Sequence, residues 1–181
     1  MRALRLIVVL LLFSCKTRLD SNTTTLNLSN QKLTAIPDSV FSLVKLERLY
    51  LGNAYTIYPP LSALGGDSEG PSGRSMNQIT QIPEDIDQLK NLRTFDLGAN
   101  DLRSLPKGMI KLGRLDTLDI SFNKHLIVSR ELNTLAKMHW LKYLNIAGTH
   151  TDPSSIDNLR KALPNTRIVS RLDEIIEEVS N

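Results

Sequence analysis

The apolar positions of this chain recur in a frame that fits neither a helix nor an alternating strand. Between residues 92 and 114 they fall at Leu92, Phe95, Leu97, Leu102, Leu105, Met109 and Leu112, with Asn100 among them. An amphipathic helix would place apolar residues every three or four positions, and a half-buried strand every second position. The spacing instead reads L-x-x-L-x-L-x-x-N-x-L, with Phe95 at the second apolar place, followed by x-x-L-P-x-x-M-x-x-L.

The same frame recurs before and after this stretch. Further units start at Leu46, Leu115 and Leu141, and a first unit begins near Thr23. Gln31 and Thr149 stand where Asn100 stands in the central unit. Repeat units of 20–29 residues with this arrangement are typical of leucine-rich repeats, and the chain resembles that family. The resemblance covers most of the chain and implies a binding surface without catalytic chemistry.

The resemblance implies an α/β repeat solenoid. Its arc has a parallel sheet on the concave face, and short helical, 3-10 or extended segments on the convex face. We assign the repeats to residues 23–170 and a C-terminal cap helix to residues 171–181. Apolar spacing predicts one helix over 129–139, and Asp152 before Pro153 predicts the start of another. Ser170 and Asp173 form a candidate capping box for the cap helix.

Residues 54–76 interrupt the frame. They number 23, the length of one unit, and their centre is rich in glycine, serine and proline from Gly65 to Gly73. Such a stretch cannot present the apolar pair of a strand. Two interpretations remain open: a loop inserted into one coil, or two neighbouring repeats that have decayed.

Residues 1–15 have the layout of an export signal. Arg2 and Arg5 precede an apolar run from Leu6 to Phe13, which is too short for a membrane-spanning helix of about 20 residues. The end of this segment, Leu-Phe-Ser-Cys, resembles the lipobox of bacterial lipoproteins. That resemblance implies a signal peptide at 1–14, a lipid on Cys15 and a tether at 15–22. The alternatives are a plain secretory signal and an unprocessed leader.

Composition narrows the compartment and the partners. Without Arg2 and Arg5 the formal net charge falls from +3 to +1, too small for strong attraction to nucleic acid, and we expect no nucleic-acid partner. The single cysteine cannot form a disulfide-bonded cap, which favours a bacterial envelope protein or an intracellular one. We expect an envelope protein anchored in the outer membrane or at the cell surface, with a secreted or periplasmic protein as the alternative.

The outward-facing strand positions define the candidate binding surface. Alternate residues of a strand point to opposite faces, so the residues between the apolar frame positions point away from the core. They are expected to form columns across the sheet, and a third column of small residues (Ser29, Gly52, Gly98, Ser121 and Ala147) leaves room for a partner. Tyr50 and Tyr143 are of a type that often supplies interface hot spots. The candidate concave binding residues are Arg48, Tyr50, Thr94, Asp96, Thr117, Asp119, Tyr143 and Asn145.

No pattern in the sequence predicts an enzyme. His125, His139 and His150 lack ligands at metal-binding spacing, and no nucleotide-binding or serine-nucleophile motif occurs, so we expect no metal, cofactor or catalytic residue. Asp96 and Asp119 are a possible carboxylate pair, but an open sheet is not expected to desolvate them enough to shift a pKa.

Three functions remain. The first is a lipid-anchored envelope protein that recognises a protein or glycan, on the concave face or on the insertion and convex side. The second is a structural or assembly component of the envelope with no external ligand. The third is an intracellular adaptor, since the Ile-Pro and Leu-Pro units resemble those of Ras-related scaffolds.

Overall fold

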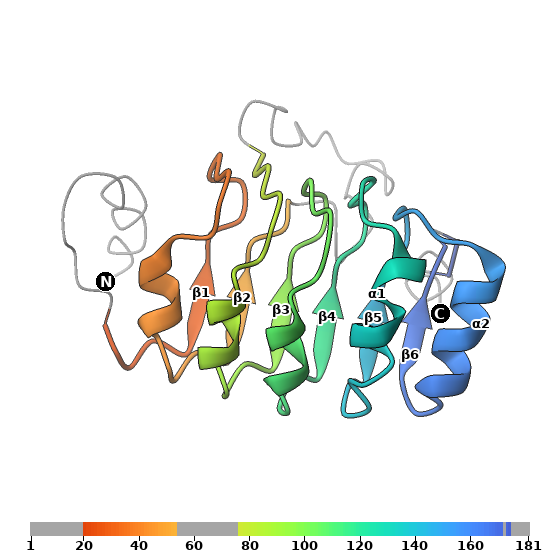
Figure 1. Ribbon diagram of the computed structural model, residues 1–181. Coiled ribbons are helices and arrows are strands. Elements are labelled where there is room, and N and C mark those ends of the chain that lie inside the picture. The colour runs from red at the N-terminus through yellow and green to blue at the C-terminus, as the bar shows by residue number, and fades with distance from the viewer. Residues whose placement is uncertain (1–19, 54–75, 172, 175–181) are drawn as a thin grey trace.

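The computed structural model describes residues 20–53, 76–171 and 173–174. Six short parallel strands form one sheet and follow one another in sequence order (Figure 1). They are β1 (Thr25–Asn27), β2 (Arg48–Tyr50), β3 (Thr94–Asp96), β4 (Thr117–Asp119), β5 (Tyr143–Asn145) and β6 (Arg167–Val169). Since neighbouring strands are parallel, every connection between them must return along one side of the sheet.

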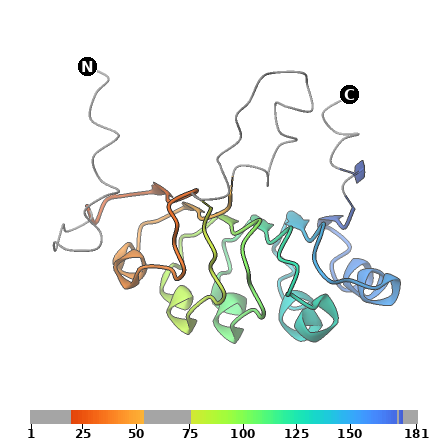
Figure 2. The ribbon, with the colours of Figure 1, turned by 90° about the horizontal axis from the view of Figure 1, so that it is seen from above.

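The returning segments form the second layer. They contain the 3-10 helices η1 (Asp38–Ser42), η4 (Glu84–Gln88) and η5 (Lys107–Lys111), and the α-helices α1 (Val128–Leu135) and α2 (Pro153–Ala162). Each 3-10 helix directly follows a proline, whose fixed φ suits an extended residue before a helix. Figure 2 shows all five helices on the same side of the sheet, along an open arc.

The two predicted helices are present, with adjusted bounds. The helix expected over 129–139 is α1, which begins at Val128 and ends at Leu135. The helix expected after Asp152 is α2, where the Asp152 carboxylate accepts a hydrogen bond from the Ser155 N–H at 2.9 Å. The core lies between the layers and consists of the repeated leucines with Phe95 at its centre, all almost fully buried. The predicted repeat solenoid with a parallel sheet is confirmed.

Asparagines satisfy the backbone groups that each turn buries. The Asn100 side-chain amide donates to the carbonyl of Leu97 in its own coil and to that of Leu51 in the coil before, and its oxygen accepts from the Ile79 N–H. Asn123 repeats the pattern with Ile120, Leu97 and Leu102. Because buried backbone groups need partners, this ladder joins the coil of β3 to that of β2 and the coil of β4 to that of β3.

Asn77 fills the same place in the coil of β2. Its amide donates to the carbonyls of Leu51 and Leu28 at 2.8 Å each, and its oxygen accepts from the N–H groups of Gln31 and Leu33. Asn77 lies 26 residues after Leu51, whereas Asn100 lies three residues after Leu97. The difference of 23 residues equals the length of the interruption, so the ladder resumes on its far side.

The two flanks of the interruption are also bonded to each other. The Asn77 N–H donates to the Asn53 side-chain oxygen at 2.8 Å, and the Asn53 amide donates to the Asn77 carbonyl at 3.0 Å. β2 pairs directly with β3, with Leu49 opposite Phe95. Both flanks therefore belong to one coil, the arrangement that a loop insertion requires. Residues 54–75 themselves lie outside the described residues.

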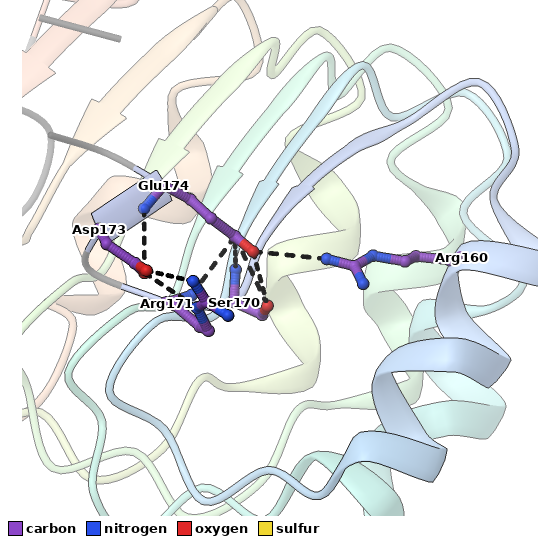
Figure 3. A network of polar contacts seen from close by, with 5 residues as sticks. All are labelled: Arg160, Ser170, Arg171, Asp173 and Glu174. Carbon is purple, nitrogen blue, oxygen red and sulfur yellow. Dashed lines mark hydrogen bonds and ion pairs between the residues drawn. The ribbon is translucent and has the colours of Figure 1, made fainter. Parts of the chain in front are cut away.

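The C-terminal end differs in one detail from the sequence prediction. The Ser170 N–H donates to Glu174, not to Asp173, at 2.7 Å (Figure 3). The Asp173 carboxylate instead bonds Arg171, and Glu174 also accepts from Arg160. The acidic partner of the Ser170 N–H is thus Glu174, one position later than the predicted Asp173, which pairs with the arginine two residues before it. Beyond Glu174 the predicted cap helix lies outside the described residues, as do Cys15, the signal segment and most of the tether.

Replacing Asn77 tests the ladder at the flank of the interruption. Asn77→Ala should lower the free energy of unfolding by about 1–3 kcal/mol, because four backbone groups, in three buried hydrogen bonds and one part-buried, lose their partner. Asn133→Ala, at an exposed position of α1, is the control and should stay within about 0.5 kcal/mol of wild type. Urea unfolding at neutral pH measures both. An Asn77→Ala variant as stable as the control would contradict the ladder.

Candidate binding surface

The outward residues of the strands line up in the predicted columns. The first column runs Thr25, Arg48, Thr94, Thr117, Tyr143 and Arg167, each paired in register with the next. The second column runs Asn27, Tyr50, Asp96, Asp119, Asn145 and Val169. The structure therefore brings all eight candidate residues onto one face of the sheet, in two adjacent rows.

The two columns differ in how much of each side chain solvent reaches. In the first column Arg48 is exposed and Thr94, Thr117 and Tyr143 are half-buried. Tyr50 is half-buried at the amino-terminal side of the second column. These five residues form the accessible part of the candidate surface, which we call the open column.

Asp96, Asp119 and Asn145 are buried, which corrects the expectation of an open and solvated carboxylate pair. Their exposed fractions are 5%, 1% and 1%. Each side-chain oxygen accepts from the backbone N–H two residues later, namely those of Gly98, Ser121 and Ala147. Asn27 makes the same bond with Ser29. The polar residues of this column are thus used to hold the turn that ends each strand.

Lateral packing explains why these side chains are covered. Asp119 lies between Asp96 and Asn145 in the sheet register, and it accepts hydrogen bonds from the Asn145 amide at 3.0 Å and the Ser121 hydroxyl at 2.6 Å. Asp96 leans over Gly52, where an added Cβ would overlap its carboxylate. The small third column therefore does not leave room for a partner at Gly52, because the neighbouring aspartate fills that space.

Burial changes the protonation of Asp119. Loss of hydration, reinforced by the nearby Asp96 charge, raises the pKa of Asp119 to about 7, although hydrogen bonds from Ser121 and Asn145 act in the opposite direction. The expectation that this sheet would leave carboxyl pKa values unshifted is therefore wrong. Near neutral pH the Asp119 carboxyl can therefore hold or release a proton while its side chain stays buried.

Two shallow hollows lie away from the sheet face. One, of about 390 Å³, is lined at the strand-end turns by Ala99, Asn100, Phe122 and Lys124 with residues 76, 78 and 101. The other, of about 430 Å³, follows residues 33–39. The sequence frame did not indicate either. Within the described ranges, no three histidine, cysteine or acidic side chains group as a metal site would require. In the same ranges, no helix is long and apolar enough to span a membrane.

The raised pKa of Asp119 gives a pH dependence with a defined sign. In the unfolded chain this carboxyl ionises near pH 4, and in the folded protein near pH 7. Between those values the folded state keeps a proton that the unfolded state has lost, so rising pH lowers stability. Asp119→Asn removes this group. Between pH 5 and pH 7 the wild type should lose about 2 kcal/mol more than the variant.

Urea unfolding at the two pH values measures that difference. The variant also loses the hydrogen bond between Asp119 and Asn145, so a constant offset between the proteins is expected, and the change with pH is the readout. The pKa of Asp116, beside Lys142 and Arg93, is lowered, and so is that of Asp152. Both groups titrate below this window. Parallel pH profiles of the two proteins would contradict the shifted pKa.

Comparison with known proteins agrees with this geometry. No protein-family model matches the chain. The flightless-1 homologue of Caenorhabditis elegans is 30% identical over 105 residues, which are 55% of this chain and 8% of that protein. A leucine-rich repeat protein of Leptospira interrogans superposes with a TM-score of 0.54 and 30% identity, over 82% of this chain and 37% of that one.

Internalin C2 of Listeria monocytogenes gives a TM-score of 0.58 at 22% identity, over 83% of this chain and 52% of that one. The chain thus spans less than two thirds of the length of each of these proteins. The neighbours share its open parallel sheet and stacked coils. The described part of the chain has the leucine-rich repeat fold.

Proposed function

We propose that this protein is a non-catalytic binding module that recognises a protein or glycan on the outward face of its sheet. Leucine-rich repeat arcs generally offer such extended surfaces to other proteins. The observation that carries the proposal is the open column. Solvent reaches Arg48, Tyr50 and Tyr143 there, and the strands that hold these residues belong to one hydrogen-bonded sheet over a packed core.

The burial pattern divides the candidate residues by role. Arg48, Tyr50, Thr94, Thr117 and Tyr143 are the ones that a partner can reach. Asp96, Asp119 and Asn145 hold the strand-end turns and so set the shape on which the open column stands. We therefore assign contact to the first group and positioning to the second.

Site-specific photo-crosslinking tests the proposed face. A benzophenone amino acid at position 48 should give a discrete adduct in producing cells, and the same residue at Lys107, exposed on η5, should not. The adduct is identified by mass spectrometry, and the purified partner is then titrated. Tyr50→Ala should weaken its binding by about tenfold or more while the melting temperature stays near that of wild type. Adducts from position 107 alone would place binding on the convex side instead.

The amino-terminal segment supports a second part of the proposal. The basic start, the short apolar run and the Leu-Phe-Ser-Cys sequence favour acylation of Cys15, which would anchor the protein to a membrane of a bacterial cell envelope. A single acyl chain gives reversible membrane binding, whereas stable anchoring needs a second chain or a second contact. In this proposal residues 1–14 are removed and residues 15–22 link the anchor to the repeats.

Intact-mass spectrometry of the protein from a bacterial envelope fraction tests the anchor. The expected species begins at Cys15 and carries two or three acyl chains. Cys15→Ala should lose that mass increase and leave the envelope fraction, while the urea midpoint of its folded domain stays unchanged. A chain that begins at Met1 with an unmodified thiol would refute the anchor and leave the sheet-face proposal standing.

A further inference from the structure

The turns that precede the strands form one edge of the arc. Because the strands are parallel, these turns all lie at the amino ends of the strands, the lower edge in Figure 1. Side chains connect them laterally. The Asn91 amide donates to the Val44 carbonyl at 2.8 Å, and Arg114 donates to the Asn91 side-chain oxygen at 2.9 Å. The turns preceding β2 to β5 comprise residues 43–47, 89–93, 112–116 and 136–142.

This edge is basic, although the protein as a whole is nearly balanced. Its six cationic side chains are all exposed: Lys45, Lys90, Arg93, Arg114, Lys137 and Lys142. Three carboxylates accompany them: Glu47, Asp116 and, in the segment that leads into β1, Asp20. Asp116 is shared between Arg93 at 3.3 Å and Lys142 at 3.0 Å, so it neutralises one charge within a row of cations.

The opposite edge, where the strands end, lacks this excess. The turns that follow β1 to β5 carry three cationic side chains and two carboxylates in the described residues: Lys32, Arg103, Lys124, Asp101 and Asp152. The net charge is thus +1 at that edge and +3 at the edge before the strands, the segment that leads into β1 included. A contrast of this size between two edges of one small arc indicates an anionic partner on the basic side.

Two further features favour a lipid surface over another polyanion. Val44 is 53% exposed, whereas the other large hydrophobic side chains of the described residues are buried or half-buried. It lies in the first of these turns, next to Lys45. An aliphatic side chain among lysines suits the interface of a bilayer, where apolar contact and attraction to phosphate act together.

The chain also enters the fold at this edge. The Lys45 ammonium donates to the Asn22 side-chain oxygen at 2.7 Å, and the Thr23 N–H donates to the Asp20 carbonyl. Asn22 follows Cys15 by seven positions, which span at most about 25 Å even when fully extended. A lipid on Cys15 would therefore be joined to the fold from this edge.

We propose that this basic edge docks on an anionic phospholipid surface. The contact would orient the protein on the membrane to which the proposed anchor at Cys15 holds it, and to that extent it rests on the proposed function of Cys15. With this edge on the bilayer, the carboxyl ends of the strands would point away from the membrane. A partner could then reach the open column from the aqueous phase. The electrostatic contact itself does not require the acyl chain.

Vesicle sedimentation of the full chain carrying Cys15→Ser tests the edge without acylation. Vesicles of phosphatidylglycerol with phosphatidylcholine are compared with pure phosphatidylcholine. The edge variant is Lys90→Glu with Lys137→Glu, whose lysine side chains make no hydrogen bond or ion pair with the described residues. The control is Lys32→Glu with Lys124→Glu on the opposite edge, which changes the net charge equally. Every protein keeps the same amino-terminal segment, so its own affinity cancels.

The edge variant should lose about tenfold or more in partition to the anionic vesicles, and the control less than about twofold. Both should melt within a few degrees of the parent. Equal losses in the two variants would overturn the proposal, because net charge alone would then explain binding. Tight binding to a DNA duplex without preference for anionic vesicles would also overturn it.

The two proposals can fail separately. An unmodified Cys15 in cells, together with a tenfold loss for the edge variant, would refute the anchor and keep the lipid-binding edge. An acylated Cys15 with equal partition of edge and control variants would keep the anchor and refute the edge.

Discussion

The constraint on which this structure depends is that each coil buries backbone groups at its turns and must find partners for them. A sheet of three-residue strands pairs too few of these groups by itself. Side chains complete the pairing across coils: Asn100 and Asn123 at the strand-end turns, and Glu84 on the convex layer, where its carboxylate accepts from the N–H groups at the start of η5. Each coil is therefore a template for the next, and stacking rather than local propensity stabilises the arc.

The same demand limits what the concave face can offer to a partner. In the sequence, Asp96, Asp119 and Asn145 look available to bind a partner. In the structure, a side-chain oxygen of each accepts a hydrogen bond from the backbone N–H two residues later. What remains available is the first column and Tyr50. In the proposed binding mode, a partner would contact a row of accessible side chains whose positions are set by the buried polar row beside it. Charge reversal in the buried row would damage the scaffold and the interface together.

The repeat frame predicts more of the fold than of the surface. Apolar spacing alone identifies which residues enter the core and which align in columns, and the register from Thr25 to Tyr143 follows that prediction. It also locates α2, because Asp152 and Pro153 are local signals. The burial of Asp119 could not be read from spacing, since it depends on the side chains that pack around it, Ser121 and Asn145 among them. At the C-terminal turn the Ser170 N–H bonds Glu174 while Asp173 pairs with Arg171, and the sequence pattern alone does not distinguish the two acidic residues.

Asn77 shows at which edge of the arc the interruption at residues 54–76 begins and ends. It takes the ladder position of the β2 coil from the far side of the interruption, and its bonds with Asn53 close the two flanks together at the edge where the strands end. Asn22, which leads into β1, and the basic turns lie at the other edge. Extra residues in one of the basic turns would cover part of the proposed lipid-binding edge. The interruption follows Asn53 instead, at the opposite edge, and does not separate the basic turns from one another. The ladder continues across the 23 residues that separate Asn53 from Asn77, because it requires an asparagine at one point in space and does not specify the length of chain that delivers it.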